Sequence, residues 1–206
     1  LRSAADLSNF EFQRETFLAR DGTAVGVMLA FKKGLRKDRN APTIVLASGG
    51  LLPLPAPFYA PHLLAWFEKG GLLAVPLTDR ALDVEDAGRW LVAKEYTRPE
   101  RLAVAAVGRG ALAAGVAAIR APEVFRAAVL LSPLTDLLGL PRMAPGARWV
   151  RDYDPPEVPG SRARLAELSP LHRVEQGVPY PAFLVSAGSW DQEVHPAHSR
   201  KLAARL

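Results

Sequence analysis

Short apolar runs alternate with amphipathic segments along most of the chain, and this pattern predicts the secondary structure. The apolar runs are rich in valine, leucine and alanine, which is typical of parallel strands that are buried on both faces. They cover residues 42–48, 72–76, 101–106, 125–131 and 180–187. The segments between them repeat apolar residues at helical spacing. These segments cover residues 61–69, 84–95, 109–120, 161–168 and 196–206.

The first part of the chain follows a different pattern, with two strands predicted over Phe10–Leu18 and Ala24–Phe31. The residues between them include Asp21-Gly22, and an Asp-Gly pair is a strong signal for a tight β-hairpin. We therefore expect an antiparallel hairpin at one edge of the sheet. In the helix predicted over 84–95, Asp83 is the expected N-cap. The residues expected to face inward are Val84, Ala87, Leu91 and Ala93.

From residue 43 onward, strands alternate with helices, and this order predicts an α/β fold. The sheet should be mostly parallel, with helices on both of its faces. Ligands of such folds bind beyond the carboxyl ends of the strands. We treat residues 1–206 as a single domain of this class.

The sharpest feature of the chain is the turn Val107-Gly108-Arg109-Gly110, which joins a predicted buried strand directly to a predicted helix. A strand that turns this tightly into a helix is the nucleophile elbow of α/β-hydrolases, whose pattern is G-x-S-x-G. The tip of the elbow normally carries a nucleophilic side chain. Here the tip is Gly108, which has none.

Composition narrows the function classes without choosing one. The chain has 206 residues, 49% of them hydrophobic and 23% charged, which is ordinary for a globular protein. It has no cysteine, and no apolar run is long enough to span a membrane. Its first residues lack the apolar core of a secretory signal. We therefore expect an intracellular protein, in the cytoplasm or in an organelle lumen such as the mitochondrial matrix.

The net charge of +5 and the pI of about 9.8 leave nucleic acid open as a partner. No basic cluster is interleaved with aromatic residues, as single-strand binding would require. The histidines His172, His195 and His198 do not form a metal-ligand spacing with any pair of carboxylates. We expect no metal and no cofactor.

Several strings of residues resemble the catalytic domain of the prolyl oligopeptidase family of serine peptidases. They occur in the family's order over about residues 19–206. The resemblance implies an α/β-hydrolase fold and cleavage of short peptides. In the family a β-propeller precedes the hydrolase domain, and this chain does not contain that propeller. The strings are ARDGTAV, LASGG, PFY, EYTRPERLAVAAVGRG, LSPLTDLL, WVRDYDPP, ELSPLHRV and YPAFLVSAGSWDQEVHPAHS.

The resemblance places the family's catalytic groups on specific positions of this chain. The nucleophilic serine corresponds to Gly108. The next residue, whose backbone N–H helps to bind the oxyanion, corresponds to Arg109. The tyrosine that supplies the second oxyanion donor corresponds to Ser48. By this resemblance, the nucleophile and one oxyanion donor are both replaced.

Other family positions are partly retained. The catalytic aspartate corresponds to Asp191, and the arginine that holds the substrate backbone corresponds to Glu193. The aromatic lining of the proline pocket corresponds to Trp149 and Tyr153. We expect these two aromatic side chains in one cleft with Asp191. Without a serine and a histidine, a loop-capping role is the alternative for Asp191, and core packing is the alternative for the aromatic pair.

Two further departures concern whole segments. The family's catalytic histidine falls beyond Leu206, and the family's Gly-rich loop after the strand at 72–76 is replaced by the short stretch LTDRALD.

The first functional hypothesis is therefore a pseudo-peptidase with a structural or protein-interaction role. Its expected partners are other protein subunits, and a peptide ligand stays open. The second is a serine oligopeptidase represented incompletely. The third is a nucleic-acid-associated subunit. We also expect the strand Ala182–Ser186 to be an apolar sheet edge that another segment or chain covers.

Overall fold

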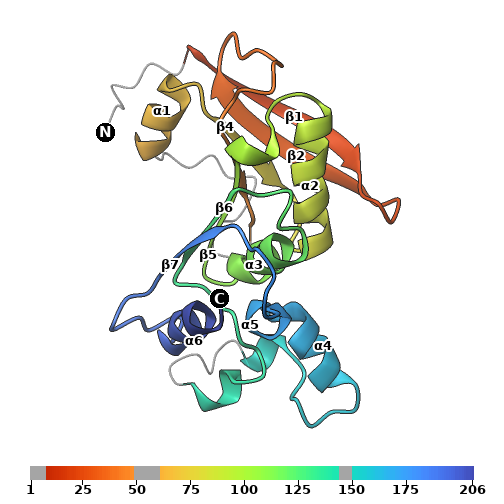
Figure 1. The fold of residues 1–206 in the computed structure, drawn as a ribbon, viewed down its shortest axis with the longest axis vertical. Coiled ribbons are helices and arrows are strands. Elements are labelled where there is room, and N and C mark those ends of the chain that lie inside the picture. The colour runs from red at the N-terminus through yellow and green to blue at the C-terminus, as the bar shows by residue number, and fades with distance from the viewer. Residues whose placement is uncertain (1–7, 49–60, 144–149) are drawn as a thin grey trace.

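A mixed β-sheet forms the centre of the structure, which is a computed structural model that describes residues 8–48, 61–143 and 150–206. Its seven strands lie in the order β1-β2-β4-β3-β5-β6-β7 (Figure 1). The strands β4, β3, β5, β6 and β7 are parallel, and β2 joins them antiparallel to β4. The strands are β1 (Phe10–Leu18), β2 (Ala24–Lys32), β3 (Thr43–Leu46), β4 (Leu72–Pro76), β5 (Leu102–Val107), β6 (Ala127–Leu131) and β7 (Ala182–Ser186).

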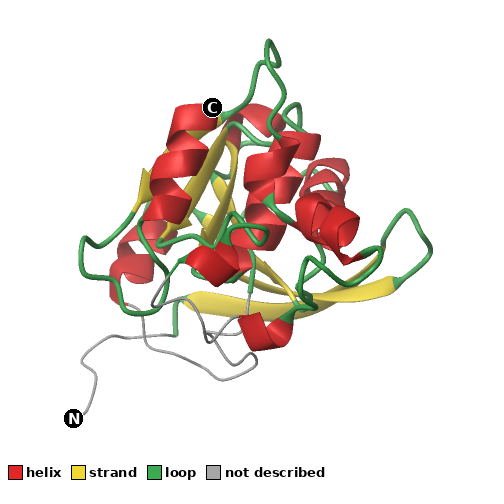
Figure 2. Cartoon of the chain, turned by 90° about the horizontal axis from the view of Figure 1, so that it is seen from below, coloured by secondary structure: helices red, strands yellow, loops and turns green. Residues whose placement is uncertain are grey.

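The predicted N-terminal hairpin is present, and β1 pairs antiparallel with β2 over their full length. The turn uses Gly22 in the left-handed region, at φ 83°, where glycine meets no steric penalty. The backbone N–H of Thr23 donates to the carboxylate of Asp21 at 3.0 Å. Asp-Gly therefore forms the hairpin as the sequence predicts, and the hairpin projects past the helices in Figure 2.

Helices cover both faces of the sheet. The face that carries Val27, Ala74 and Val104 packs against α2 and α3. The opposite face of β2, β3 and β4 packs against α1, where Phe67 contacts the ring of Phe10 at 5.6 Å between centroids. The α-helices are α1 (Pro61–Glu68), α2 (Ala81–Ala93), α3 (Gly110–Arg120), α4 (Ser161–Leu168), α5 (Pro170–Arg173) and α6 (Ala197–Arg205), and the short 3-10 helices are η1 (Pro99–Arg101) and η2 (Leu140–Arg142).

This architecture confirms the predicted fold class: an α/β-hydrolase sheet, mostly parallel, with an antiparallel hairpin at its N-terminal edge. The predicted strands and long helices are all present, with ends that differ by a few residues. The short helices α5 and η1 were not predicted. Each begins with a proline, which favours the first position of a helix but gives no periodic pattern in so short a segment.

Two details of α2 differ from the sequence analysis. The helix begins at Ala81 with Arg80 as its N-cap residue, so Asp83 is not the cap. Asp83 lies instead in the first turn, and its carboxylate accepts a hydrogen bond from the hydroxyl of Thr78 at 2.7 Å. The connection from β4 to α2 is short, and the helix therefore starts earlier than the apolar pattern indicates. Ala93 is exposed, whereas Val84 is fully buried.

The strand β7 lies at the end of the described sheet. On the face opposite α3, Val107, Leu131 and Leu184 are 42%, 40% and 56% exposed. Apolar side chains on this part of the sheet therefore remain open to solvent in the described structure. A search of the described residues found no helix that is both long enough and apolar enough to cross a membrane.

Candidate active site

The turn after β5 has the geometry of a nucleophile elbow. Gly108 follows the last residue of β5 and adopts φ 57°. This is the left-handed region, which residues other than glycine rarely adopt. Helix α3 begins two residues later, at Gly110. The strand therefore reverses into a helix within Gly108 and Arg109.

Hydrogen bonds hold the tip of the elbow in place. The backbone N–H of Gly108 donates to the carbonyl of Leu131 on the neighbouring strand β6 at 2.9 Å. The carbonyl of Gly108 accepts from the N–H groups of Ala111, at 3.3 Å, and Leu134, at 2.9 Å. The scaffold that presents a nucleophile is thus intact, but the position that it presents carries no side chain.

The side chain of Arg109 takes up the space next to the elbow. Its guanidinium lies 3.4 Å from a carboxylate oxygen of Asp152 and 3.9 Å from one of Asp79. It also lies over the ring of Tyr153, at 5.7 Å from the ring centroid, which is the range of a cation–π contact. Arg109 therefore connects the elbow to the loop after β4 and to the segment around Tyr153.

Tyr153 is half-buried beside this arginine. Burial raises the pKa of its phenol, and the positive charge of Arg109 opposes that rise. The phenol consequently stays protonated at neutral pH. It can donate a hydrogen bond, but it cannot act as a base near pH 7.

A cavity of about 450 Å³ lies beside the elbow. Ser48, Arg109 and Tyr153 all line it, so the fold brings these three predicted site residues together. The hydroxyl of Ser48 donates to the backbone carbonyl of Thr78 at 3.2 Å. Ser48 therefore ties the end of β3 to the loop after β4.

Asp191 and Glu193 lie in the loop after β7, and neither is among the residues that line the cavity. One carboxylate oxygen of Asp191 accepts from the backbone N–H groups of Glu193, at 2.8 Å, and Val194, at 2.9 Å. This is the arrangement that a loop-capping carboxylate makes. Trp149, the other aromatic residue predicted for the site, lies outside the described residues.

A buried carboxylate that the sequence analysis missed lies in the loop after β6. Asp136 is 1% exposed, and one of its oxygens lies 2.9 Å from Nε2 of His172. Its other oxygen accepts from the ammonium group of Lys201. Burial alone would raise the pKa of Asp136, but the hydrogen bonds from Lys201, Gly139 and His172 outweigh it and lower the pKa. Asp136 is therefore an ionised structural group.

His198 packs against the same loop and is fully buried. Its Nδ1 accepts from the backbone N–H of Asp136 at 3.2 Å, and its Nε2 is buried with no hydrogen-bond partner among the described residues. Burial lowers the pKa of this imidazole to about 4. No signal in the sequence distinguishes this histidine from His195, because only the packing of α6 buries it.

The described side chains do not assemble a catalytic triad or a metal centre. The hydroxyls of Ser48, Ser161, Ser169 and Ser199 all donate to backbone carbonyls and not to a histidine. The described residues contain no group of three or more histidine, aspartate or glutamate residues placed to hold a metal ion. The elbow therefore has a formed backbone and a cavity beside it, and no hydrogen bond within the described ranges links Gly108 or Arg109 to a histidine.

Comparison with known proteins agrees with this geometry. The model of the prolyl oligopeptidase family matches residues 78–206. An uncharacterised peptidase of Sinorhizobium fredii is 31% identical in an alignment of 220 positions that covers 97% of this chain and 30% of that protein. A prolyl endopeptidase of Elizabethkingia meningoseptica is 28% identical, over 96% of this chain and 31% of that protein.

Solved structures give the same result. One of two prolyl endopeptidases analysed together superimposes with a TM-score of 0.89 at 29% identity, over 100% of this chain and 33% of that one. Prolyl oligopeptidase B from Galerina marginata also superimposes with a TM-score of 0.89, at 27% identity, over 98% of this chain and 32% of that one. The chain thus spans about a third of the length of these relatives.

Proposed function

The chain belongs to the prolyl oligopeptidase family, and from that premise we propose that it is a member that no longer hydrolyses peptides and serves a structural or protein-interaction role. The observation that carries the proposal is Gly108 at the tip of the elbow. Covalent acyl transfer needs a hydroxyl or thiol at that point, and glycine offers neither.

The groups around the elbow support the same conclusion. Where the resemblance implies a tyrosine that stabilises the oxyanion, Ser48 donates its hydroxyl to a backbone carbonyl. Where it implies an arginine that holds substrate, the chain has Glu193, which reverses the charge. Losing one member of a catalytic triad already costs several orders of magnitude in rate. Changes at several positions favour a loss of activity that is not confined to one residue.

The elbow retains features that suit binding without cleavage. The cavity beside it is lined by a cationic side chain, Arg109, and by the aromatic ring of Tyr153. Arginine and tyrosine are both enriched where proteins bind other proteins, because each offers a large contact area together with hydrogen-bond donors. A peptide segment of a partner protein is the ligand that this chemistry favours.

The second candidate is a serine oligopeptidase of which this chain forms one part. The observation that favours it is that the chain covers only about a third of the length of its relatives. The remaining two thirds of such a protein leave room for catalytic groups outside these 206 residues. Gly108 lies inside the stretch, however, so this candidate must place its nucleophile elsewhere.

An activity assay on the full-length protein decides between the two candidates. We expect no turnover of three substrates: a fluorogenic peptide with proline before the scissile bond, the same peptide with arginine in place of that proline, and an activated ester. The prolyl endopeptidase of Elizabethkingia meningoseptica is the positive control. Turnover that a fluorophosphonate abolishes, with the label mapped to a serine of this protein, would overturn the proposal.

The variant Gly108→Ser tests whether the loss is confined to the elbow. We expect it to remain inactive, because no hydrogen bond within the described ranges links Gly108 or Arg109 to a histidine that would accept the proton. Gly108→Ala is the matched control, since both variants add a Cβ at φ 57° and differ only in the hydroxyl. If Gly108→Ser gains hydrolysis over Gly108→Ala, the rest of the catalytic machinery is intact and the second candidate is favoured.

A further inference from the structure

The cavity beside the elbow continues along the whole length of α3. Gly110 at the start of α3 lines it, and so do Arg109, Leu112, Ala113, Val116 and Arg120, which recur at the spacing of one helix face. Eleven steps along the helix lead from the first to the last, so the lined face is roughly 16 Å long at the rise of about 1.5 Å per residue of an α-helix. Figure 1 shows α3 between α2 on one side and the α4–α5 pair on the other.

The charged residues that line this cavity fall into two sets. At the end near the elbow, Arg80 and Arg109 lie among the carboxylates of Asp79 and Asp152, and Arg80 also pairs with Asp21. Positive and negative groups are balanced there. Arg120 at the C-terminal end of α3, Arg164 and Glu167 on α4 and Arg173 on α5 also line the cavity; we call this set, three arginines with a single glutamate, the arginine end.

The three guanidinium groups of the arginine end are weakly engaged by the protein. Arg120 lies 3.9 Å from Glu85, beyond hydrogen-bond distance, and Glu85 is already bound by Arg20. Arg164 lies 3.6 Å from an exposed carboxylate, that of Asp154. Arg173 donates its Nε–H to the backbone carbonyl of Glu167 at 3.0 Å. Within the described ranges, none of the three arginines donates a hydrogen bond to a carboxylate.

Apolar side chains from three helices line the same cavity, and we call them its floor. Leu82 from α2, Val116 from α3 and Leu168 from α4 all line the cavity, and Leu168 is 38% exposed. The arginine end therefore combines an excess of positive charge with apolar surface. A ligand that fits it carries negative charge next to an apolar group.

We propose that the arginine end binds an acidic peptide segment of a partner protein, with carboxylates on the guanidinium groups and a neighbouring apolar side chain on the floor. This inference rests on the proposed protein-interaction role. Arginine binds carboxylates through paired N–H donors, which gives direction as well as charge. Single-stranded nucleic acid fits less well, because it needs aromatic surfaces for its bases and the described lining of the arginine end has none.

The proposal is tested by fluorescence polarisation on the full-length protein. The probe is a fluorescein-labelled heptapeptide of sequence Gly-Leu-Leu-Glu-Glu-Leu-Gly, and the comparison peptide has both glutamates replaced by glutamine. We expect the acidic peptide to bind about tenfold more tightly, as a charge-assisted hydrogen bond provides. Equal binding of the two peptides, or no binding of either, would overturn the proposal.

A charge-reversal variant with a matched control locates the site. Arg164→Glu changes a residue of the arginine end, whereas Arg162→Glu makes the same change in net charge at an exposed residue of α4 that does not line the cavity. We expect Arg164→Glu to weaken binding of the acidic peptide about tenfold and Arg162→Glu to change it less than about twofold. Equal effects would mean non-specific attraction and would contradict the proposal.

Two further measurements separate the remaining outcomes. Arg173→Gln, which removes one charge without reversing it, should also weaken binding of the acidic peptide. A ten-nucleotide oligothymidine that binds more tightly than this peptide and displaces it would assign the surface to nucleic acid instead. Hydrolysis is measured separately on the same protein. Absence of binding to the acidic peptide contradicts this inference, whereas hydrolysis contradicts the proposed loss of peptidase activity.

Discussion

At the scale of single residues, His198 shows how packing changes the chemistry of a side chain. It is fully buried, and its imidazole accepts a hydrogen bond through Nδ1, which leaves the proton on Nε2. Burial lowers its pKa from 6.5 to about 4. Between these pH values the unfolded chain takes up a proton at this site and the folded chain does not. The free energy of unfolding must therefore fall as the pH drops through that window.

We expect this histidine to contribute about 3 kcal/mol to the difference in stability between pH 7 and pH 4. The variant His198→Asn keeps a hydrogen-bond acceptor but cannot ionise, so it should flatten the pH dependence over this range. Urea unfolding at a series of pH values measures the effect. His195→Asn is the matched control, because it makes the same substitution at a nearby histidine that is only half-buried. An unchanged slope in His198→Asn would show that another group titrates.

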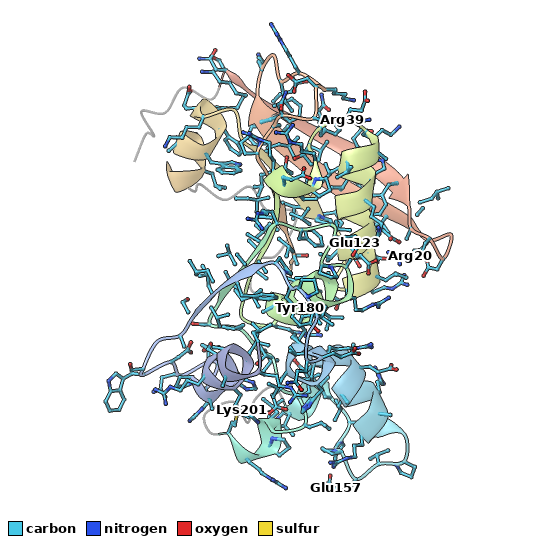
Figure 3. All side chains as sticks on the ribbon, viewed as in Figure 1. Arg20, Arg39, Glu123, Glu157, Tyr180 and Lys201 are labelled. Atoms are coloured by element: carbon cyan, nitrogen blue, oxygen red, sulfur yellow. The ribbon has the colours of Figure 1, made fainter. Side chains whose placement is uncertain are left out.

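At the scale of elements, Arg20 connects the N-terminal hairpin to helix α2. Its guanidinium pairs with Glu85 and, at 2.6 Å, with Asp86, and its backbone N–H donates to Asp86 at 2.8 Å. The side chain of Glu85 is only 3% exposed, and Arg89 also lies 3.2 Å from it. Figure 3 shows Arg20 and Glu123 at one end of α2 and Arg39 near the other.

We expect Arg20→Ala to destabilise the protein by about 2 kcal/mol, because it leaves two buried carboxylates with fewer partners. The value is lower than for a fully buried pair, since the side chain of Arg20 is 45% exposed. Arg39→Ala is the matched control, because Arg39 and its partner Glu95 are 60% and 54% exposed. It should cost less than about 0.5 kcal/mol. Thermal and urea unfolding measure the loss of stability in each variant. Equal losses in Arg20→Ala and Arg39→Ala would mean that burial of the carboxylates does not set the cost.

At the scale of the whole molecule, the sheet has one edge that its neighbours protect poorly. β7 ends the described sheet, and its residues Phe183, Leu184 and Val185 are apolar, with Leu184 56% exposed. No lysine or proline lies within the strand to discourage pairing. Exposed apolar edges of this kind favour association with another strand.

We expect the polypeptide of residues 1–206, when expressed alone, to be oligomeric or poorly soluble. Sedimentation velocity measures the association, and amide hydrogen exchange at Ala182–Ser186 reports whether the edge is covered. Leu184→Lys, which places a charge on the exposed face of β7, should shift the population toward monomer. A monomeric, cooperatively unfolding sample whose edge amides exchange rapidly would show that the edge needs no cover.

The order of elements follows from the sequence by itself, because it depends on local patterns. Apolar runs predict the parallel strands, Asp21-Gly22 predicts the hairpin, and the absence of a nucleophile at Gly108 is a matter of residue identity alone. The start of α2 was predicted wrongly, since a short connection lets the helix begin before its apolar pattern does.

Only the tertiary structure decided which distant residues meet. Arg120, Arg164 and Arg173 come from three separate helices, and no spacing in the chain indicates that they line one cavity. Burial of His198 and Asp136 likewise depends on how α5 and α6 pack. Local periodicity carries information about neighbours along a strand or a helix, whereas a charge cluster or a shifted pKa depends on contacts between elements, which only the three-dimensional packing determines.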